Sequence, residues 1–167
     1  MAARRSRRWF WSFYFALRGL FRVWRGERNM RVHAAAASLV SWAAWAAELE
    51  PVQWGILVVL IALVMVGEML NTVVEAVVDL QVEEYHPTAE VAKDAMAGGV
   101  LLTAMAALGV GYLFFGSILA DLPRLFYLRA VEDPFITAVF AVVTSFFLAA
   151  ALVAVLNTDQ GGTGYVE

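Results

Sequence analysis

The chain contains no cysteine, only four prolines and two histidines among 167 residues, and few charged side chains, at 16%. The absence of cysteine excludes disulfide bonds, thiol catalysis and cysteine-ligated metals, and it leaves the redox compartment undetermined. The scarcity of charge accompanies a hydrophobic content of 62% and a mean hydropathy of +0.70, which is typical of an integral membrane protein. A chain of this length has room for one helical bundle and no separate soluble domain.

Positive charge is concentrated near the N-terminus. Arg18, Arg22 and Arg25 share one face of a helix predicted over residues 9–25, whose other positions are mostly aromatic or aliphatic. An arginine stripe opposite aromatic side chains describes an interfacial helix that lies along the lipid headgroups. Beside membrane spans, such a cluster binds anionic lipid rather than nucleic acid. Nine of the 12 Lys and Arg residues precede residue 32: Arg4, Arg5, Arg7, Arg8, Arg18, Arg22, Arg25, Arg28 and Arg31.

Four apolar segments predict membrane spans. Residues 32–47 form a short, alanine-rich first span, and residues 52–80 form one helix of roughly 43 Å at ~1.5 Å per residue, longer than the ~30 Å hydrocarbon core. A third span runs from residue 92 to about 119, opened by Pro87, and an uncharged fourth covers residues 135–156 after Asp133-Pro134. The fold class is therefore all-α: a polytopic helical membrane protein.

The chain divides into four parts. Residues 1–31 form the basic, aromatic interfacial helix and the start of a polar hinge over residues 26–33. Residues 32–120 form the transmembrane core. Residues 121–156 form an amphipathic connector and the additional fourth span, and residues 157–167, rich in glycine, form a flexible tail.

Basic residues also predict the orientation. With the N-terminus in the cytoplasm, ten basic residues lie inside and only Arg124 and Arg129 lie outside. Several polar groups from separate segments then meet on the cytoplasmic side: Glu27, Glu68, Glu75, Asp79, Lys93 and Asp94.

A stripe of polar side chains lies inside the second apolar segment. Glu68, Asn71, Glu75 and Asp79 follow the spacing i, i+3, i+7, i+11 and share an arc about 80° wide on a helix. A carboxylate costs about 2.5–3.5 kcal/mol at the bilayer centre, so a row at the membrane edge needs a compensating partner. A divalent cation, which prefers oxygen ligands, would supply it. The same spacing also fits the solvated face of a helix end that emerges into water.

Carboxylates, an asparagine and a lysine at a membrane boundary suit two different functions. Phosphoryl transfer needs a divalent ion between phosphates, a cation on them and a base near the attacking hydroxyl. A cation or proton transporter also uses a carboxylate row, and the pattern alone favours neither function. A third interpretation, a membrane accessory protein anchored by its arginine-rich helix, leaves the carboxylates unexplained. The sequence contains no Walker Gly-Lys-Ser loop, so a nucleotide would bind on the helices themselves.

Several motifs add to this interpretation. Residues 68–79 read EMLNTVVEAVVD, and Glu84-Tyr85-His86 and Ala92-Lys93-Asp94-Ala95 follow. Upstream lie SF at 12–13, ALRG at 16–19 and ERNMRVH at 27–33. In composition and spacing, this set resembles the signature of the small prokaryotic integral membrane diacylglycerol kinase and undecaprenol kinase family. The resemblance covers roughly residues 8–120.

The resemblance implies an ATP-dependent lipid kinase that phosphorylates undecaprenol or diacylglycerol. It implies a homotrimer in the bacterial inner membrane, with cytoplasmic active sites built from neighbouring chains. Carried over to this sequence, the family's general base is Glu68, its Mg²⁺ ligands are Glu27 and Glu75, and Asn71 positions phosphate or catalytic groups. Lys93 neutralises phosphate charge, and the remaining nucleotide-binding residues are Asp79, Asp94 and Arg18.

Two features bear on this expectation. The Glu-Arg-Asn-x-x-x-His stretch that begins at Glu27 resembles the undecaprenol-kinase branch and favours a polyprenol substrate. The fourth span, residues 135–156, exceeds the family's usual three-span architecture and contains no residue that looks catalytic.

Overall fold

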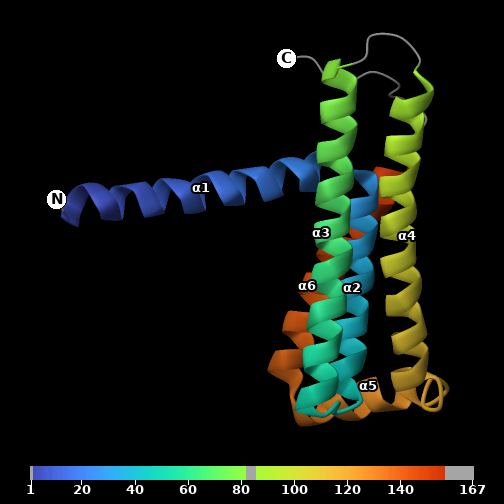
Figure 1. The fold of residues 1–167 in the computed structure, drawn as a ribbon. Helices are drawn as coiled ribbons and strands as arrows, with labels where there is room; N and C mark the ends of the chain where they lie inside the picture. Colours follow the sequence, from blue (N-terminus) through green and yellow to red (C-terminus); the bar gives the residue numbers. More distant parts are fainter. Residues whose placement is uncertain (1, 82–85, 157–167) are drawn as a thin grey trace.

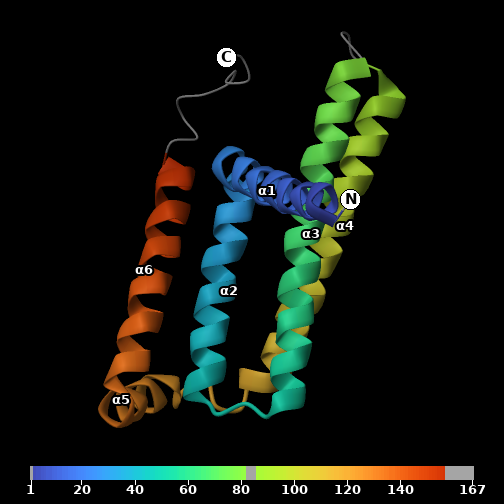
Figure 2. The ribbon, with the colours of Figure 1, turned by 90° about the vertical axis from the view of Figure 1, so that its left-hand side faces the viewer.

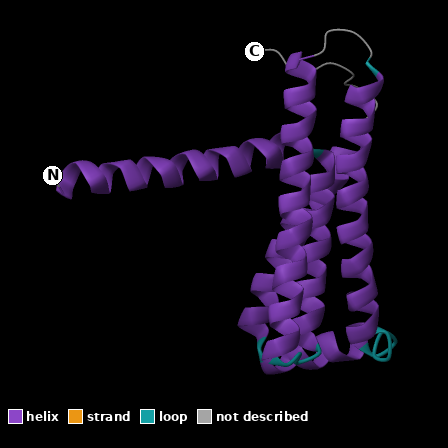
Figure 3. Cartoon of the chain, in the orientation of Figure 1, coloured by secondary structure: helices purple, strands orange, loops and turns teal. Residues whose placement is uncertain are grey.

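The computed structural model describes residues 2–81 and 86–156, and within these ranges it is built from helices alone (Figures 1 and 3). The prediction of an all-α fold is therefore confirmed. The uncharged and alanine-rich segments contain few helix breakers, and the prolines at positions 51, 87 and 134 each stand at the first residue of a helix. The elements are α1 (Ala2–Gly26), α2 (Arg28–Ala46), α3 (Pro51–Gln81), α4 (Pro87–Phe115), α5 (Leu122–Glu132) and α6 (Pro134–Leu156).

Four long helices run side by side in the spatial order α6, α2, α3, α4 (Figure 2). Helix α2 packs against α6 on one side and α3 on the other, and α3 packs against α4. Helix α5 crosses the end of the bundle and joins α4 to α6 (Figure 2). Helix α1 leaves the opposite half of the bundle at a steep angle and extends away from it (Figure 1). This direction is the one expected of a helix lying along a membrane surface, and that role stays a prediction.

Three of the described helices are long and apolar enough to cross a membrane: α3, α4 and α6. Large apolar side chains on these helices are exposed, for example Leu63, Leu101 and Val142. Such surfaces require lipid or another apolar partner. Helix α2 does not meet the same criterion, because the polar residues in its first two turns, with its serines and tryptophans, lower its mean hydropathy. It lies between two such helices, and its membrane crossing stays a prediction.

The predicted segment over residues 52–80 is confirmed as one continuous helix, α3. The predicted hinge over residues 26–33 was too long. Only Glu27, in extended conformation with φ −94° and ψ 122°, separates α1 from α2, because the following Arg28-Asn29-Met30-Arg31 run is compatible with a helix.

The third span ends at Phe115 rather than near Leu119. The chain turns after that residue through short-range bonds, with the backbone N–H of Ile118 donating to the carbonyl of Phe115 (3.0 Å). The predicted flexible tail over residues 157–167 lies outside the described residues, and so do Glu84 and Tyr85 of the Glu84-Tyr85-His86 motif.

Candidate active site

Three of the predicted site residues lie on one face of α3. Glu68 and Asn71 are buried, with 3% and 9% of their surfaces exposed, and Glu75 lies one turn further along the helix. The amide Nδ2 of Asn71 donates a hydrogen bond to Oε1 of Glu75 (2.8 Å). In the polar stripe predicted from spacing, Asn71 and Glu75 thus form a connected pair next to the buried carboxylate of Glu68, whereas Asp79 is exposed.

The buried carboxylate of Glu68 has a partner that the sequence did not reveal. His33 on α2 brings its Nε2 atom to 3.1 Å from Oε1 of Glu68. A buried carboxylate is costly unless it is hydrogen-bonded, and this imidazole supplies that bond. His33 stands alone at the start of the apolar run over residues 32–47, and the sequence assigns it no role in the site.

Two further carboxylates gather around Glu68. Glu27, at the junction of α1 and α2, and Glu75, on α3, both act on the Glu68 carboxyl electrostatically. The backbone N–H of Glu27 donates to the carbonyl of Val23 (2.8 Å), so the junction stays close to the end of α1. The structure therefore brings together three acidic side chains from two parts of the chain, as the sequence predicted.

The other predicted site residues lie further toward the end of α3. Lys93 on α4 forms an ion pair with Asp79 on α3, with 2.5 Å between Nζ and Oδ1. Both side chains are accessible to solvent, at 36% and 66% exposure. Asp94 and Arg18 are exposed and lie outside the buried cluster. Of the predicted residues, the structure groups Glu27, Glu68, Asn71 and Glu75 in one cluster and Asp79 with Lys93 in another.

The donor atoms of the first cluster suit a hard divalent cation. Oxygen is the ligand atom that Mg²⁺ prefers, and Mg²⁺ is usually held by one or two carboxylates together with water and substrate phosphates. Glu27 and Glu75 offer two carboxylates, and Oδ1 of Asn71 is a buried acceptor with no hydrogen-bond partner among the described residues. Within the described parts of the chain, no group of three or more His, Asp or Glu side chains could hold a metal ion by itself. The residues therefore fit an ion shared with a phosphate ligand.

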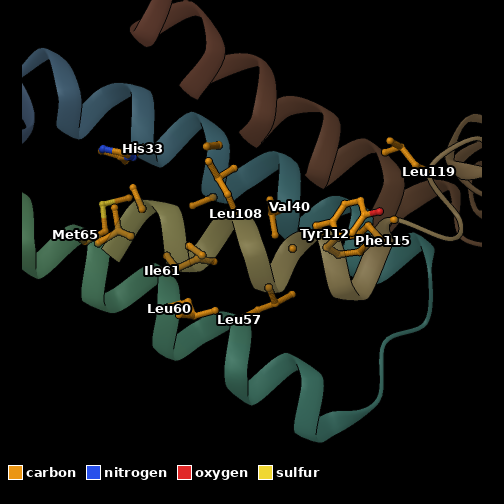
Figure 4. A pocket seen from close by; sticks show the side chains of 17 residues that line it. His33, Val40, Leu57, Leu60, Ile61, Met65, Leu108, Tyr112, Phe115 and Leu119 are labelled. Carbon is orange, nitrogen blue, oxygen red and sulfur yellow. The ribbon is translucent and has the colours of Figure 1, made fainter. Parts of the chain in front are cut away.

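An apolar cavity of about 410 Å³ extends from His33 between α2, α3 and α4 (Figure 4). His33 and Met65 line one end, and Tyr112 and Phe115 line the other (Figure 4). Nearly all of its lining is aliphatic or aromatic, so the cavity suits a hydrocarbon chain. Its polar end is the imidazole that also contacts Glu68.

The chain has relatives among known proteins. Residues 14–115 match the family described as prokaryotic diacylglycerol kinase. The chain is 42% identical over 108 residues to the undecaprenol kinase of Bacillus subtilis (strain 168), an alignment that covers 65% of this chain and 88% of that protein. It is 43% identical over 101 residues to the diacylglycerol kinase of Synechocystis sp. (strain ATCC 27184 / PCC 6803 / Kazusa), covering 60% of this chain and 58% of the relative. No solved structure matches the chain.

Proposed function

Since the chain belongs to the prokaryotic diacylglycerol kinase family and is a membrane lipid kinase, we propose that it transfers the γ-phosphate of ATP, with Mg²⁺, to the hydroxyl of undecaprenol or diacylglycerol. The observation that carries this proposal is the position of Glu68. This buried carboxylate lies against His33 at the polar end of an apolar cavity.

The acceptor lipid fits the cavity by its chemistry. A lipid alcohol consists of long hydrocarbon and one reactive hydroxyl, and the cavity offers an apolar wall that ends at His33, the residue that contacts Glu68. With the hydrocarbon between α2, α3 and α4, the hydroxyl would reach the Glu68 carboxylate. Glu68 would accept the hydroxyl proton as general base, and the bond from His33 would hold the carboxylate in place. The apolar walls would keep bulk water from competing as acceptor.

The phosphate side of the reaction would use the remaining polar residues. Glu27 and Glu75 would hold Mg²⁺, which when bound neutralises charge on the ATP phosphates. Asn71, bonded to Glu75, would fix the direction of that carboxylate and offer its free Oδ1 atom to the site. Lys93 would exchange its contact with Asp79 for one with phosphate, and the remaining nucleotide contacts would come from Asp79, Asp94 and Arg18.

We also propose the arrangement in the membrane. The protein would lie in the bacterial inner membrane with its N-terminus and active site toward the cytoplasm, because the basic residues are concentrated on that side. The arginines of α1 would contact anionic lipid headgroups. A homotrimer would complete each active site with residues of a neighbouring chain, as the family resemblance implies.

The proposal is tested by an assay of the purified full-length protein in mixed micelles. Labelled ATP and Mg²⁺ are supplied with a panel of lipid alcohols, and we expect label to be transferred to undecaprenol or diacylglycerol. Phosphorylation of neither lipid, together with cation or proton flux in liposomes, would instead establish the transporter alternative. The apolar lining of the cavity argues against that alternative, since it provides no polar path between the helices.

A second prediction concerns the lipid cavity. The substitution Ala107→Phe places a ring in the space that the hydrocarbon would occupy, because Ala107 lines the cavity. We expect the KM for the lipid alcohol to rise about tenfold, since filling such a space costs about 1–3 kcal/mol. The KM for ATP should stay unchanged in the same assay. The neighbouring Ala106→Phe, at an exposed position outside the cavity lining, is the matched control and should change neither constant. Equal effects of the two substitutions would exclude the cavity as the lipid site.

A further inference from the structure

Helices α5 and α6 have no role in the reaction as proposed, and they lie beyond residues 14–115 that match the family. Helix α6 nevertheless packs along α2, on the side that faces away from α3 (Figure 2). Near its start, α6 contacts the end of α2, and near its middle it contacts α1.

One end of this pair of helices is fixed to the loop between α2 and α3. Arg129 on α5 forms ion pairs with Glu48, in that loop, and with Glu132, and its guanidinium group lies 5.9 Å from the ring centre of Trp45. Phe140 on α6 packs against the same Trp45, with 5.5 Å between ring centres. This end is far from the acidic cluster along α2, because Trp45 and His33 lie twelve residues apart on one helix.

The middle of α6, about two turns beyond Phe140, contacts α1. Trp24 lies against Phe147, with 5.3 Å between ring centres and the rings nearly perpendicular, and it stacks on Phe146 at 6.5 Å. Edge-to-face and stacked aromatic pairs are specific contacts that favour one relative orientation of the two rings. Trp24 is partly buried, whereas the side chains of α1 from Trp11 to Arg18 are all exposed. The α6 rings are therefore an anchor for the last turn of α1.

That last turn leads directly into Glu27. Trp24 precedes Glu27 by three residues, and Glu27 is the single extended residue between α1 and α2. A one-residue junction leaves its φ and ψ angles as the main determinants of the angle between the two helices. Whatever fixes α1 relative to α2 therefore also fixes the direction in which the Glu27 side chain leaves the backbone.

We propose that α6 is an internal brace that holds the α1–α2 junction and so positions Glu27 for the Mg²⁺–nucleotide complex. Trp24, Phe146 and Phe147 are the positioning residues of this brace. The inference rests on the proposed role of Glu27 and assigns a task to the span that the family match does not cover. The ion pairs of Arg129 hold the far end of the brace, so that α6 cannot swing away from α2 as the junction moves.

The test compares two aromatic substitutions on α6 in the full-length protein. Phe147→Ala removes the contact with Trp24, and Phe140→Ala removes the contact with Trp45 two turns nearer the start of α6. We expect Phe147→Ala to raise the Mg²⁺ concentration for half-maximal activity about fivefold to tenfold, with the KM for the lipid unchanged. Phe140→Ala should leave both values at wild type. The two variants should lower the melting temperature by similar amounts, because each removes one aromatic contact of α6. Trp24→Phe, which keeps a ring at the contact, should stay close to wild type.

A second measurement follows the junction without any reaction. Because the chain lacks cysteine, Leu17→Cys and Val52→Cys, both at exposed positions, introduce the only two labelling sites, on α1 and α3. Spin labels at these sites, in protein diluted with unlabelled chains, report the distribution of distances between the helices. Phe147→Ala should broaden this distribution and Phe140→Ala should not. Identical behaviour of the two variants in both measurements would overturn the brace, whereas full activity of Glu27→Gln would overturn the proposed role of Glu27 itself.

Discussion

Glu68→Gln is expected to lower kcat of lipid phosphorylation by about 10²–10⁴-fold, the range over which a positioned general base contributes. The amide keeps the shape of the side chain and still accepts a hydrogen bond from His33, but it cannot take a proton from the lipid hydroxyl. Because Glu68 is 3% exposed and tightly packed, the isosteric change should leave the fold and the binding of ATP intact. Initial rates at saturating ATP and lipid measure the effect.

The matched control for this prediction is Glu50→Gln. Glu50 is an exposed carboxylate immediately before the first residue of α3, at the far end of that helix from Glu68. Its substitution should leave kcat at wild type. Turnover of Glu68→Gln within a few fold of wild type would remove Glu68 from the role of base. The melting temperature of both variants in detergent separates loss of chemistry from loss of structure.

Glu75→Gln is expected to weaken the response to Mg²⁺ by about 10-fold to 100-fold and to lower kcat/KM for ATP in parallel. Replacing one of two carboxylate ligands removes a negative charge from a site that must hold a divalent ion, and losses of this order follow even from changes to groups that only orient ligands. The amide retains the length of the side chain and leaves a hydrogen bond with Asn71 possible. Activity measured against Mg²⁺ concentration at fixed ATP gives the shift.

Asp121→Asn serves as its control, because this exposed carboxylate lies in the turn between α4 and α5. It should leave the Mg²⁺ response unchanged. A Glu75→Gln variant whose Mg²⁺ curve overlies that of wild type, with a reduced rate alone, would show that Glu75 acts on something other than the metal. The lipid KM should not move in either variant.

Much of the site could be predicted because it depends on local spacing. Glu68, Asn71 and Glu75 are on one helix, and the pitch of an α-helix is known, so their shared stripe follows from sequence positions alone. The start of α4 at Pro87 and of α6 at Pro134 follows from the preference of proline for the first turn. The prediction that Glu27 and Glu68 lie on the same side of the membrane required one further assumption, that basic residues orient the segments.

The remainder depends on how separate helices pack, and one sequence does not encode that in any local pattern. The pairing of His33 with Glu68 joins residues on two helices, and nothing in the apolar run around His33 indicates which face meets α3. The packing of α6 on α2 is decided by aromatic contacts between residues far apart in the chain, such as Trp45 with Phe140. The sequence predicts a hinge over residues 26–33, longer than the single-residue junction at Glu27, because polar residues are common in hinges. The polar residues from Arg28 onward are equally compatible with a helix.

The order of the helices also determines how a substrate arrives. The cavity is lined from α2, α3 and α4, but α2 and α4 share few contacts of their own, so the cavity is least enclosed between these two helices. A molecule dissolved in the hydrocarbon would then enter sideways, by two-dimensional diffusion within one leaflet. For such an enzyme, the quantity that governs saturation is the mole fraction of the alcohol among the surrounding lipids, and dilution of the aqueous phase has no effect on it.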